Sequence, residues 1–261
     1  AWLLKSVALL GLGEASVFWI NCDENDRMDV AHLDCTLSAD AAEGSTVLPV
    51  AVVVTAGTTA TGVCDDILTV GDICKKYSVW CHADAAYGGF ASLLKDFDRL
   101  DDLEDCASVR RMQFGNVSSL VVDPHKWGFV SVESSVLLVR NAIDLFSAFS
   151  GEAAYYSFDH TSEISMLHWG IQTSRSDKAT KVWALMQAVG LDEMRTAIGR
   201  NCLLAQWLFK ELSRHPRFEA KSCHLSIVCF RLLQAPENEK SLNLSRLNSG
   251  IVEFLNKSSP V

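Results

Sequence analysis

Three polar segments of the sequence combine residue types that could do chemistry. They read TAGTT at 55–59, HADAAYGG at 82–89 and DPHKW at 123–127. Each follows an apolar run of the length typical of a β-strand. In an open parallel sheet the carboxyl ends of the strands converge on one crevice, so segments placed there can share one ligand. We therefore expect all three to contribute to a single site.

Asp84 is the acid of the second segment. It directly follows the apolar strand predicted at 79–83, and small residues come after it. A carboxylate at the mouth of a buried strand needs a cationic or hydrogen-bonding partner. A protonated pyridine nitrogen would satisfy it, and the ion pair would keep that ring an electron sink for a carbanion. The more ordinary explanation of an isolated acid at this place is a cap on the following turn.

Lys126 is the candidate nucleophile of the third segment. Pro124 fixes the backbone before it, and Trp127 shields one side. A lysine held among such groups loses its proton more easily and can attack an aldehyde. Most single lysines are solvated surface charges. Lys126 differs because its segment is one of three that are expected to share a site. His125 could carry a proton, hydrogen-bond a cofactor or simply fill a gap.

The first segment offers hydroxyl groups. Gly57 is followed by Thr58 and Thr59, which gives a tight turn with two hydroxyls after a buried strand. Such a turn is suited to orienting a carboxylate or a ring oxygen by hydrogen bonds. A turn of this composition is equally common without any role in binding a ligand.

A metal-dependent hydrolase is a competing interpretation of the same segments. His82 and Asp84 have the His-x-Asp spacing that can supply two ligands, and His125 could be a third. This interpretation leaves Lys126 unexplained, so we assign no residue to a metal.

The elements that must position these segments alternate between strands and helices. The run at 49–55 is apolar on both faces, which favours a parallel strand covered by helices on both sides. The alternation predicts an α/β layer fold. Strands are expected at 16–20, 49–55, 79–83, 119–122 and 134–140, and helices at 2–13, 29–43 and from 65–66 to about 77.

The C-terminal part is predicted to be mainly helical. Helices are expected at 178–189 and 191–215, separated near Gly190, then one strand at 225–233 and one amphipathic helix within 237–261. We therefore expect residues 1–190 to form part of a large domain and residues 191–261 part of a smaller α+β C-terminal domain.

Composition excludes several classes of protein. With 261 residues, 49% of them hydrophobic and 21% charged, the chain can bury one core and part of a second, unlike a disordered protein. The longest apolar runs, 48–56 and 225–233, fall short of the roughly 20 residues that cross a bilayer, and the start does not resemble a secretory signal. The net charge of −9 is spread along the chain without a basic patch, so we expect no nucleic-acid partner.

The cysteines and the absent motifs narrow the classes further. Nine cysteines form no Cys-x-x-Cys pair, which is typical of reduced thiols in a cytoplasmic protein. No dinucleotide Gly-x-Gly-x-x-Gly, phosphate-loop Gly-Lys-Ser/Thr or Gly-x-Ser-x-Gly elbow occurs.

The series TAGTTATG, HADAAYGG and DPHKW, in this order and spacing, resembles the pyridoxal-phosphate-dependent (group II) amino-acid decarboxylase family. DENDRMD at 23–29 and WGIQTSR at 169–175 also resemble stretches of that family, so the likeness covers most of the chain. The resemblance implies an aspartate-aminotransferase-like (type I) fold, with a mostly parallel sheet and helices on both faces.

The resemblance also implies roles for individual residues. Lys126 would form the Schiff base with pyridoxal 5'-phosphate, and Asp84 would pair with the pyridinium nitrogen, which makes these two the catalytic residues. Ala86 would pack on the face of the ring. Other implied positions are Thr59 and His125 lining the cofactor pocket, Asp65 supporting the neighbouring loop, and Arg175 near the site.

The activity implied by the resemblance is the decarboxylation of an L-amino acid to an amine and CO2, a step of carboxylic-acid metabolism, in a cytoplasmic homodimer. Another pyridoxal-phosphate lyase or a transaminase stays open, because a Schiff base activates any bond held perpendicular to the ring. A fragment without activity that serves as a folded partner-binding module also stays open.

Two departures from the family pattern bear on this expectation. The family's Ser/Gly-rich phosphate loop and ring-stacking histidine come from sequence before the present Ala1, which is not an initiator Met. A phosphate needs several donors, so the chain alone is expected to bind the cofactor weakly. The aromatic amino-acid branch also has a catalytic tyrosine in a mobile loop, whereas Tyr155 and Tyr156 do not align with it and receive no role.

Overall fold

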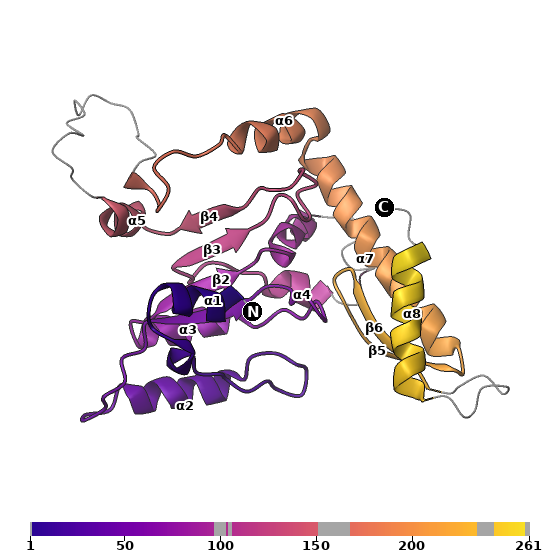
Figure 1. The fold of residues 1–261 in the computed structure, drawn as a ribbon, viewed down its shortest axis with the longest axis horizontal. Coiled ribbons are helices and arrows are strands. Elements are labelled where there is room, and N and C mark those ends of the chain that lie inside the picture. The colour runs from indigo at the N-terminus through magenta and orange to yellow at the C-terminus, as the bar shows by residue number, and fades with distance from the viewer. Residues whose placement is uncertain (1, 97–102, 104–105, 151–167, 234–242, 259–261) are drawn as a thin grey trace.

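The sheet predicted from the sequence is present in the computed structural model, which describes residues 2–96, 103, 106–150, 168–233 and 243–258 (Figure 1). Its strands, in spatial order, are β1 (Ala51–Thr55), β2 (Trp80–Asp84), β3 (Ser119–Val122) and β4 (Val136–Val139). The first three are parallel and β4 is antiparallel to β3. Thr55, Asp84 and Val121 are in register, so the carboxyl ends of β1, β2 and β3 are level.

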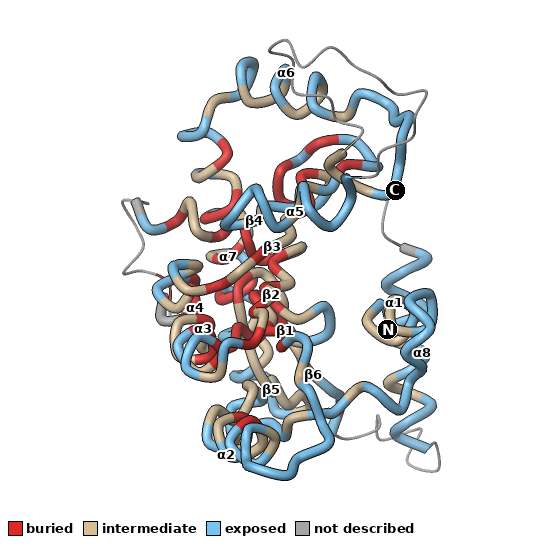
Figure 2. Tube along the Cα trace, turned by 90° about the vertical axis from the view of Figure 1, so that its left-hand side faces the viewer, coloured by how far each residue is buried: buried red, intermediate tan, exposed pale blue. Residues whose placement is uncertain are grey.

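Helices cover both faces of this sheet, as predicted. Alternate residues of β1 and β2 enter a buried core with α2 (Val30–Asp40) and α3 (Ile67–Lys76), namely Val52, Val54, Cys81 and Ala83. Side chains alternate across a strand, so His82 and Asp84 face the opposite side, where α1 (Trp2–Leu9) lies. Figure 2 shows α3 and α1 on opposite sides of the strands.

Acidic caps fix where the two core helices begin. The Asp29 side chain accepts hydrogen bonds from the backbone nitrogens of Ala31 and His32, and the Asp66 side chain accepts one from Thr69. These bonds satisfy backbone donors that a helix start leaves without partners. The helices predicted after residues 29 and 66 are thereby confirmed.

The C-terminal part packs against the sheet part through a second core. Helices α6 (Ala179–Val189) and α7 (Leu191–Arg214) are separated at Gly190, whose φ of 81° ends the first of them. A hairpin of β5 (Phe218–His224) and β6 (Ile227–Leu232) follows, then α8 (Leu244–Ser258). The second core joins Trp127 of the DPHKW segment to Ile198 and Cys202 of α7.

The structure corrects several predicted elements. The strand predicted at 16–20 is wrong: η1 (Glu14–Ser16) is a 3₁₀ turn, and residues 17–20 pair with no described strand. The helix predicted to reach residue 13 ends at Leu9, because Gly11 and Gly13 have positive φ. Four elements were missed: η2 (Gly88–Asp96), α4 (Cys106–Arg111), α5 (Ala142–Phe149) and β5.

Two general expectations concern the thiols and the membrane. None of the cysteines whose side chains are described forms a disulfide: Cys22, Cys35, Cys64, Cys74, Cys81, Cys202, Cys223 and Cys229. Within the described ranges, no helix combines the length and the apolar character needed to cross a bilayer.

Candidate active site

The three polar segments meet at the carboxyl edge of the sheet. The backbone nitrogen of Ala56 donates to the carbonyl of Asp84 at 2.8 Å, and that of Ala85 donates to the carbonyl of Val121 at 3.0 Å. The backbone nitrogen of Asp123 donates to the carbonyl of Ala86 at 3.2 Å. The expectation that the segments after β1, β2 and β3 converge is therefore confirmed.

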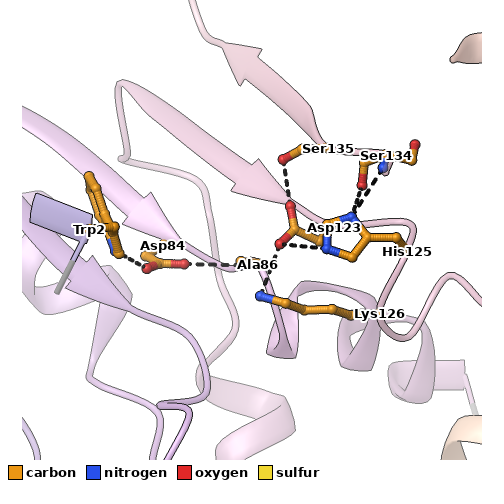
Figure 3. A network of polar contacts seen from close by, with 8 residues as sticks. All are labelled: Trp2, Asp84, Ala86, Asp123, His125, Lys126, Ser134 and Ser135. Carbon is orange, nitrogen blue, oxygen red and sulfur yellow. Dashed lines mark hydrogen bonds and ion pairs between the residues drawn. The ribbon is translucent and has the colours of Figure 1, made fainter. Parts of the chain in front are cut away.

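A short polar path connects Asp84 with Lys126 (Figure 3). Oδ1 of Asp84 accepts from the backbone nitrogen of Ala86 at 3.2 Å, and the Ala86 carbonyl accepts from Asp123. Oδ2 of Asp123 in turn lies 2.9 Å from Nζ of Lys126. The acid and the amine thus stand at neighbouring strand ends with the small side chain of Ala86 between them.

Asp123 organises the end of the site that carries the amine. Its Oδ1 accepts from the hydroxyl of Ser135, and its Oδ2 lies 3.7 Å from Nε2 of His125. Nδ1 of His125 contacts the Ser134 carbonyl. The Lys126 side chain is 41% exposed while that of Asp123 is 11% exposed, so the amine projects outward from a largely buried anion.

The backbone that follows β2 packs closely on the end of β1. A Cβ on Gly88 would lie 2.3 Å from the Ala56 carbonyl oxygen, so only glycine fits there. The ring of the preceding residue, Tyr87, packs on the ring of Trp127 with centroids 4.5 Å apart. The Tyr87 hydroxyl forms a 2.6 Å hydrogen bond with Oγ of Ser226. Burial raises the pKa of Tyr87 to about 12, so this phenol stays protonated and serves as a structural contact.

Asp65, for which the resemblance implies support of the neighbouring loop, binds the backbone at the end of β1. It is 7% exposed, and its two carboxylate oxygens accept from the backbone nitrogens of Met28 and Thr55, both at 2.8 Å. Burial raises the pKa of Asp65, although these two hydrogen bonds oppose the shift. The carboxylate ties the 22–28 turn to the end of β1.

Thr59 and Arg175 are not brought to the acid and the amine by any described contact. Thr59 is exposed in a turn closed by a 2.7 Å bond between the hydroxyls of Thr58 and Thr61. The Arg175 guanidinium donates to the Gln172 carbonyl at 2.7 Å. Tyr155 and Tyr156 lie outside the described residues.

The two residues of the His-x-Asp pair make contacts of other kinds. Nδ1 of His82 pairs with Oγ of Ser119 at 2.8 Å, and burial lowers the pKa of His82 although Asp84 opposes the shift. A neutral imidazole therefore stands beside the Asp84 carboxylate near neutral pH. In the described part of the chain, no three His, Cys, Asp or Glu side chains are grouped so as to hold a metal ion.

Two residues of this site were missed in the sequence. Asp123 was quoted in its motif without a role, although an acid three positions before the lysine and directly after a strand was a usable signal. Trp2 donates a hydrogen bond from Nε1 to Oδ2 of Asp84 at 2.7 Å. The two residues are 82 positions apart, so no local sequence pattern predicts this contact.

The donor set fits the ring and the aldehyde of pyridoxal phosphate. Asp84 offers an anion to a pyridinium nitrogen, Lys126 offers an exposed amine to an aldehyde, and Ala86 between them is small enough for a flat ring to approach. Surface hollows of about 430 and 500 Å³ lie between α2 and α3 and along α8, away from these groups.

Comparison with known proteins identifies the family. Residues 4–233 match the family described as the pyridoxal-dependent decarboxylase conserved domain. The aromatic-L-amino-acid decarboxylase of Rattus norvegicus is 32% identical over 250 residues, which are 94% of this chain and 49% of that protein. The chain thus spans about half the length of the curated relatives it matches.

Solved structures agree with this fold. Mouse CSAD in its apo form is 26% identical with a TM-score of 0.77, over 98% of this chain and 52% of that one. Oryza sativa TDC, solved with PLP and tryptamine, has a TM-score of 0.84 at 23% identity, over 97% of this chain and 51% of that one. The predicted type I fold is confirmed, and the chain belongs to the pyridoxal-dependent decarboxylase family.

Proposed function

We propose that the protein containing this chain decarboxylates an L-amino acid to an amine and CO2 with pyridoxal 5'-phosphate as cofactor. The observation that carries the proposal is the path from Asp84 through Ala86 and Asp123 to Lys126. It sets an acid and an amine at neighbouring strand ends, which is what a cofactor with a basic ring nitrogen and an aldehyde requires.

Each residue of the path has a distinct task. Nζ of Lys126 would hold the cofactor as an imine of its aldehyde, with release of water, and Asp123 holds that amine at the strand end. Asp84 would accept a hydrogen bond from the protonated ring nitrogen, and the neutral His82 beside it adds no competing positive charge. When bound, pyridoxal phosphate supplies an electron-accepting ring that stabilises the carbanion left by the departing CO2.

His125 and Thr59 complete the proposed lining of the pocket. The contacts of His125 with Asp123 and Ser134 keep its ring next to the amine, which supports a direct contact with the cofactor. Thr59 belongs to the turn that leaves β1, which supports assigning it to the same strand edge.

We also propose that the protein is a cytoplasmic homodimer whose large domain ends near Gly190. The break between α6 and α7 at that glycine supports the boundary between 1–190 and 191–261. Described cysteines that are not paired in disulfides support the cytoplasm as the compartment. Exposed large apolar side chains, which a partner subunit could cover, support the dimer; the most exposed among the described residues are Leu9, Leu48, Val132 and Ile171.

A product assay tests the proposed activity. The chain is incubated with pyridoxal phosphate and with L-tryptophan, L-tyrosine or L-glutamate. Each amino acid is labelled in its α-carboxyl carbon. We expect labelled CO2 and the matching amine in equal amounts from at least one substrate, and no product after Lys126→Ala.

Lys181→Ala is the matched control for that variant. Its amine donates to the Ser131 carbonyl at 2.9 Å, in the loop that follows the DPHKW segment, so it is a nearby lysine without an assigned role in the chemistry. Activity retained in this control and lost in Lys126→Ala supports the proposal. An oxo acid formed without CO2 identifies a transaminase and contradicts it.

A further inference from the structure

Trp2 lies directly on the acid of the proposed site. It is the first residue of α1, and its Nε1 donates to Oδ2 of Asp84 at 2.7 Å (Figure 3). Its ring meets that of His82 edge-on, with centroids 6.0 Å apart and an angle of 73° between the planes. The indole therefore covers the face of β2 from which Asp84 projects.

The contact of Trp2 with Asp84 has the chemistry that the cofactor needs at the same place. A pyridinium ring is a flat aromatic group whose N–H donates to a carboxylate oxygen, and the indole is also a flat aromatic group with an N–H donor. Oδ1 of Asp84 already accepts from the backbone of Ala86. Oδ2 is the oxygen left for a ring nitrogen, and the indole N–H is bonded to it.

The indole is lightly held, so it can leave. Trp2 is 45% exposed, and α1 contains no buried residue that would anchor this first turn. Its bond to Asp84 has a neutral donor, whereas a pyridinium N–H carries a positive charge and makes the stronger, charge-assisted bond. A cofactor ring that reaches Asp84 therefore displaces the indole rather than being excluded by it.

We propose that Trp2 is an affinity-determining residue of the cofactor site, and that its indole competes with the cofactor's ring nitrogen for Oδ2 of Asp84. The proposal rests on the proposed function of Asp84. In the free chain only the fraction of molecules with an open Asp84 can accept the ring, which weakens the apparent affinity by that fraction. Removing the indole N–H should remove this penalty.

Cofactor titration of the full chain tests the competition. Wild type, Trp2→Phe and Trp2→Ala are titrated with pyridoxal phosphate, and the bound amount is measured by equilibrium dialysis. We expect both variants to bind about tenfold more tightly, from the usual strength of a hydrogen bond to a charged group. Trp207→Phe, the same change at a 61% exposed tryptophan on α7, should bind like wild type.

A second readout follows the indole itself. In an amide NMR spectrum the Nε1–H resonance of Trp2 is the one missing from Trp2→Phe. We expect it to shift in Asp84→Ala without cofactor, and to shift in wild type when pyridoxal phosphate is added. Urea unfolding of each variant confirms that the fold is retained.

The outcomes separate this inference from the proposed function. If wild type binds the cofactor at Lys126 but the Trp2 variants bind equally or more weakly, or the resonance does not move, the competition is refuted while the proposed function stands. If neither wild type nor the Trp2 variants bind pyridoxal phosphate, the proposed function fails and the inference fails with it.

Discussion

The two ends of the candidate site are held in different ways. Asp84 is the last residue of a central strand, and its backbone is fixed between Thr55 of β1 and Val121 of β3. Lys126 lies in the connection between β3 and β4 and is held by the side chain of Asp123. The acid is therefore positioned by the sheet, whereas the amine is positioned by a local polar cluster.

The largest effect is expected where a buried carboxylate supports the sheet end. Asp65→Ala leaves the backbone nitrogens of Met28 and Thr55 without their acceptor, so we expect the free energy of unfolding to fall by about 2–4 kcal/mol. Urea unfolding measures this. The adjacent Asp66→Ala removes only a helix cap and should cost about 1 kcal/mol. Equal losses in the two variants would show that the sheet end does not depend on Asp65.

Asp84→Ala probes the acid while leaving its strand in place. A charge-assisted bond to the ring nitrogen is lost, which should weaken cofactor binding by about 2 kcal/mol, or roughly 30-fold. The backbone of the strand keeps its ladder, so the urea midpoint should change little. Equilibrium dialysis with pyridoxal phosphate gives the affinity, with Asp34→Asn on the surface as control. Unchanged affinity would remove Asp84 from the site.

Ser135→Ala probes the cluster around the amine. The variant loses one hydrogen bond to Asp123, so we expect the free energy that holds Asp123 and Lys126 in place to fall by about 1 kcal/mol. The rate at which Lys126 bonds to pyridoxal phosphate should fall about fivefold without a loss of fold. Stopped-flow absorbance measures this rate. A rate equal to that of wild type would mean that the cluster does not position the amine.

A further effect concerns the pH dependence of stability. Burial lowers the pKa of His82 below its unfolded value near 6.5, so the folded state binds fewer protons in that range. The contribution of neutral His82 to the free energy of unfolding is fully present above pH 6.5. It is lost as the pH falls below that value, by at most about 1.4 kcal/mol per pH unit. Urea unfolding at pH 7.5 and 5.5 should show a larger loss in wild type than in His82→Gln. Parallel losses would contradict this assignment.

The sequence predicted the parts of the fold that have local signals. The strand at 119–122 was predicted with its exact bounds, and the helices after Asp29 and Asp66 began where their capping acids lie. The convergence of three segments followed from the rule for parallel strands. Strand β5 was missed because FEAKSCH contains one large apolar residue, Phe218, and the predicted strand began inside the turn at Leu225.

The parts that sequence could not supply depend on tertiary contacts. The strand expected at 16–20 needs a hydrogen-bonded neighbour, and an apolar run does not reveal whether one exists. The bond from Trp2 to Asp84 joins residues 82 positions apart, so neither residue's surroundings in the sequence indicate it. Likewise, Thr59 was assigned from its motif, whereas the structure leaves it exposed without a described contact to the acid or the amine.

The central claim is that the amine of Lys126 and the acid of Asp84 serve one cofactor. Borohydride reduction of the chain in the presence of pyridoxal phosphate, followed by peptide mapping, tests it most directly. We predict a single pyridoxyl group on Lys126 in wild type, and much less label at the same cofactor concentration in Asp84→Ala. Label on Lys178, Lys181 or another lysine instead, or label on Lys126 that does not depend on Asp84, would contradict the account.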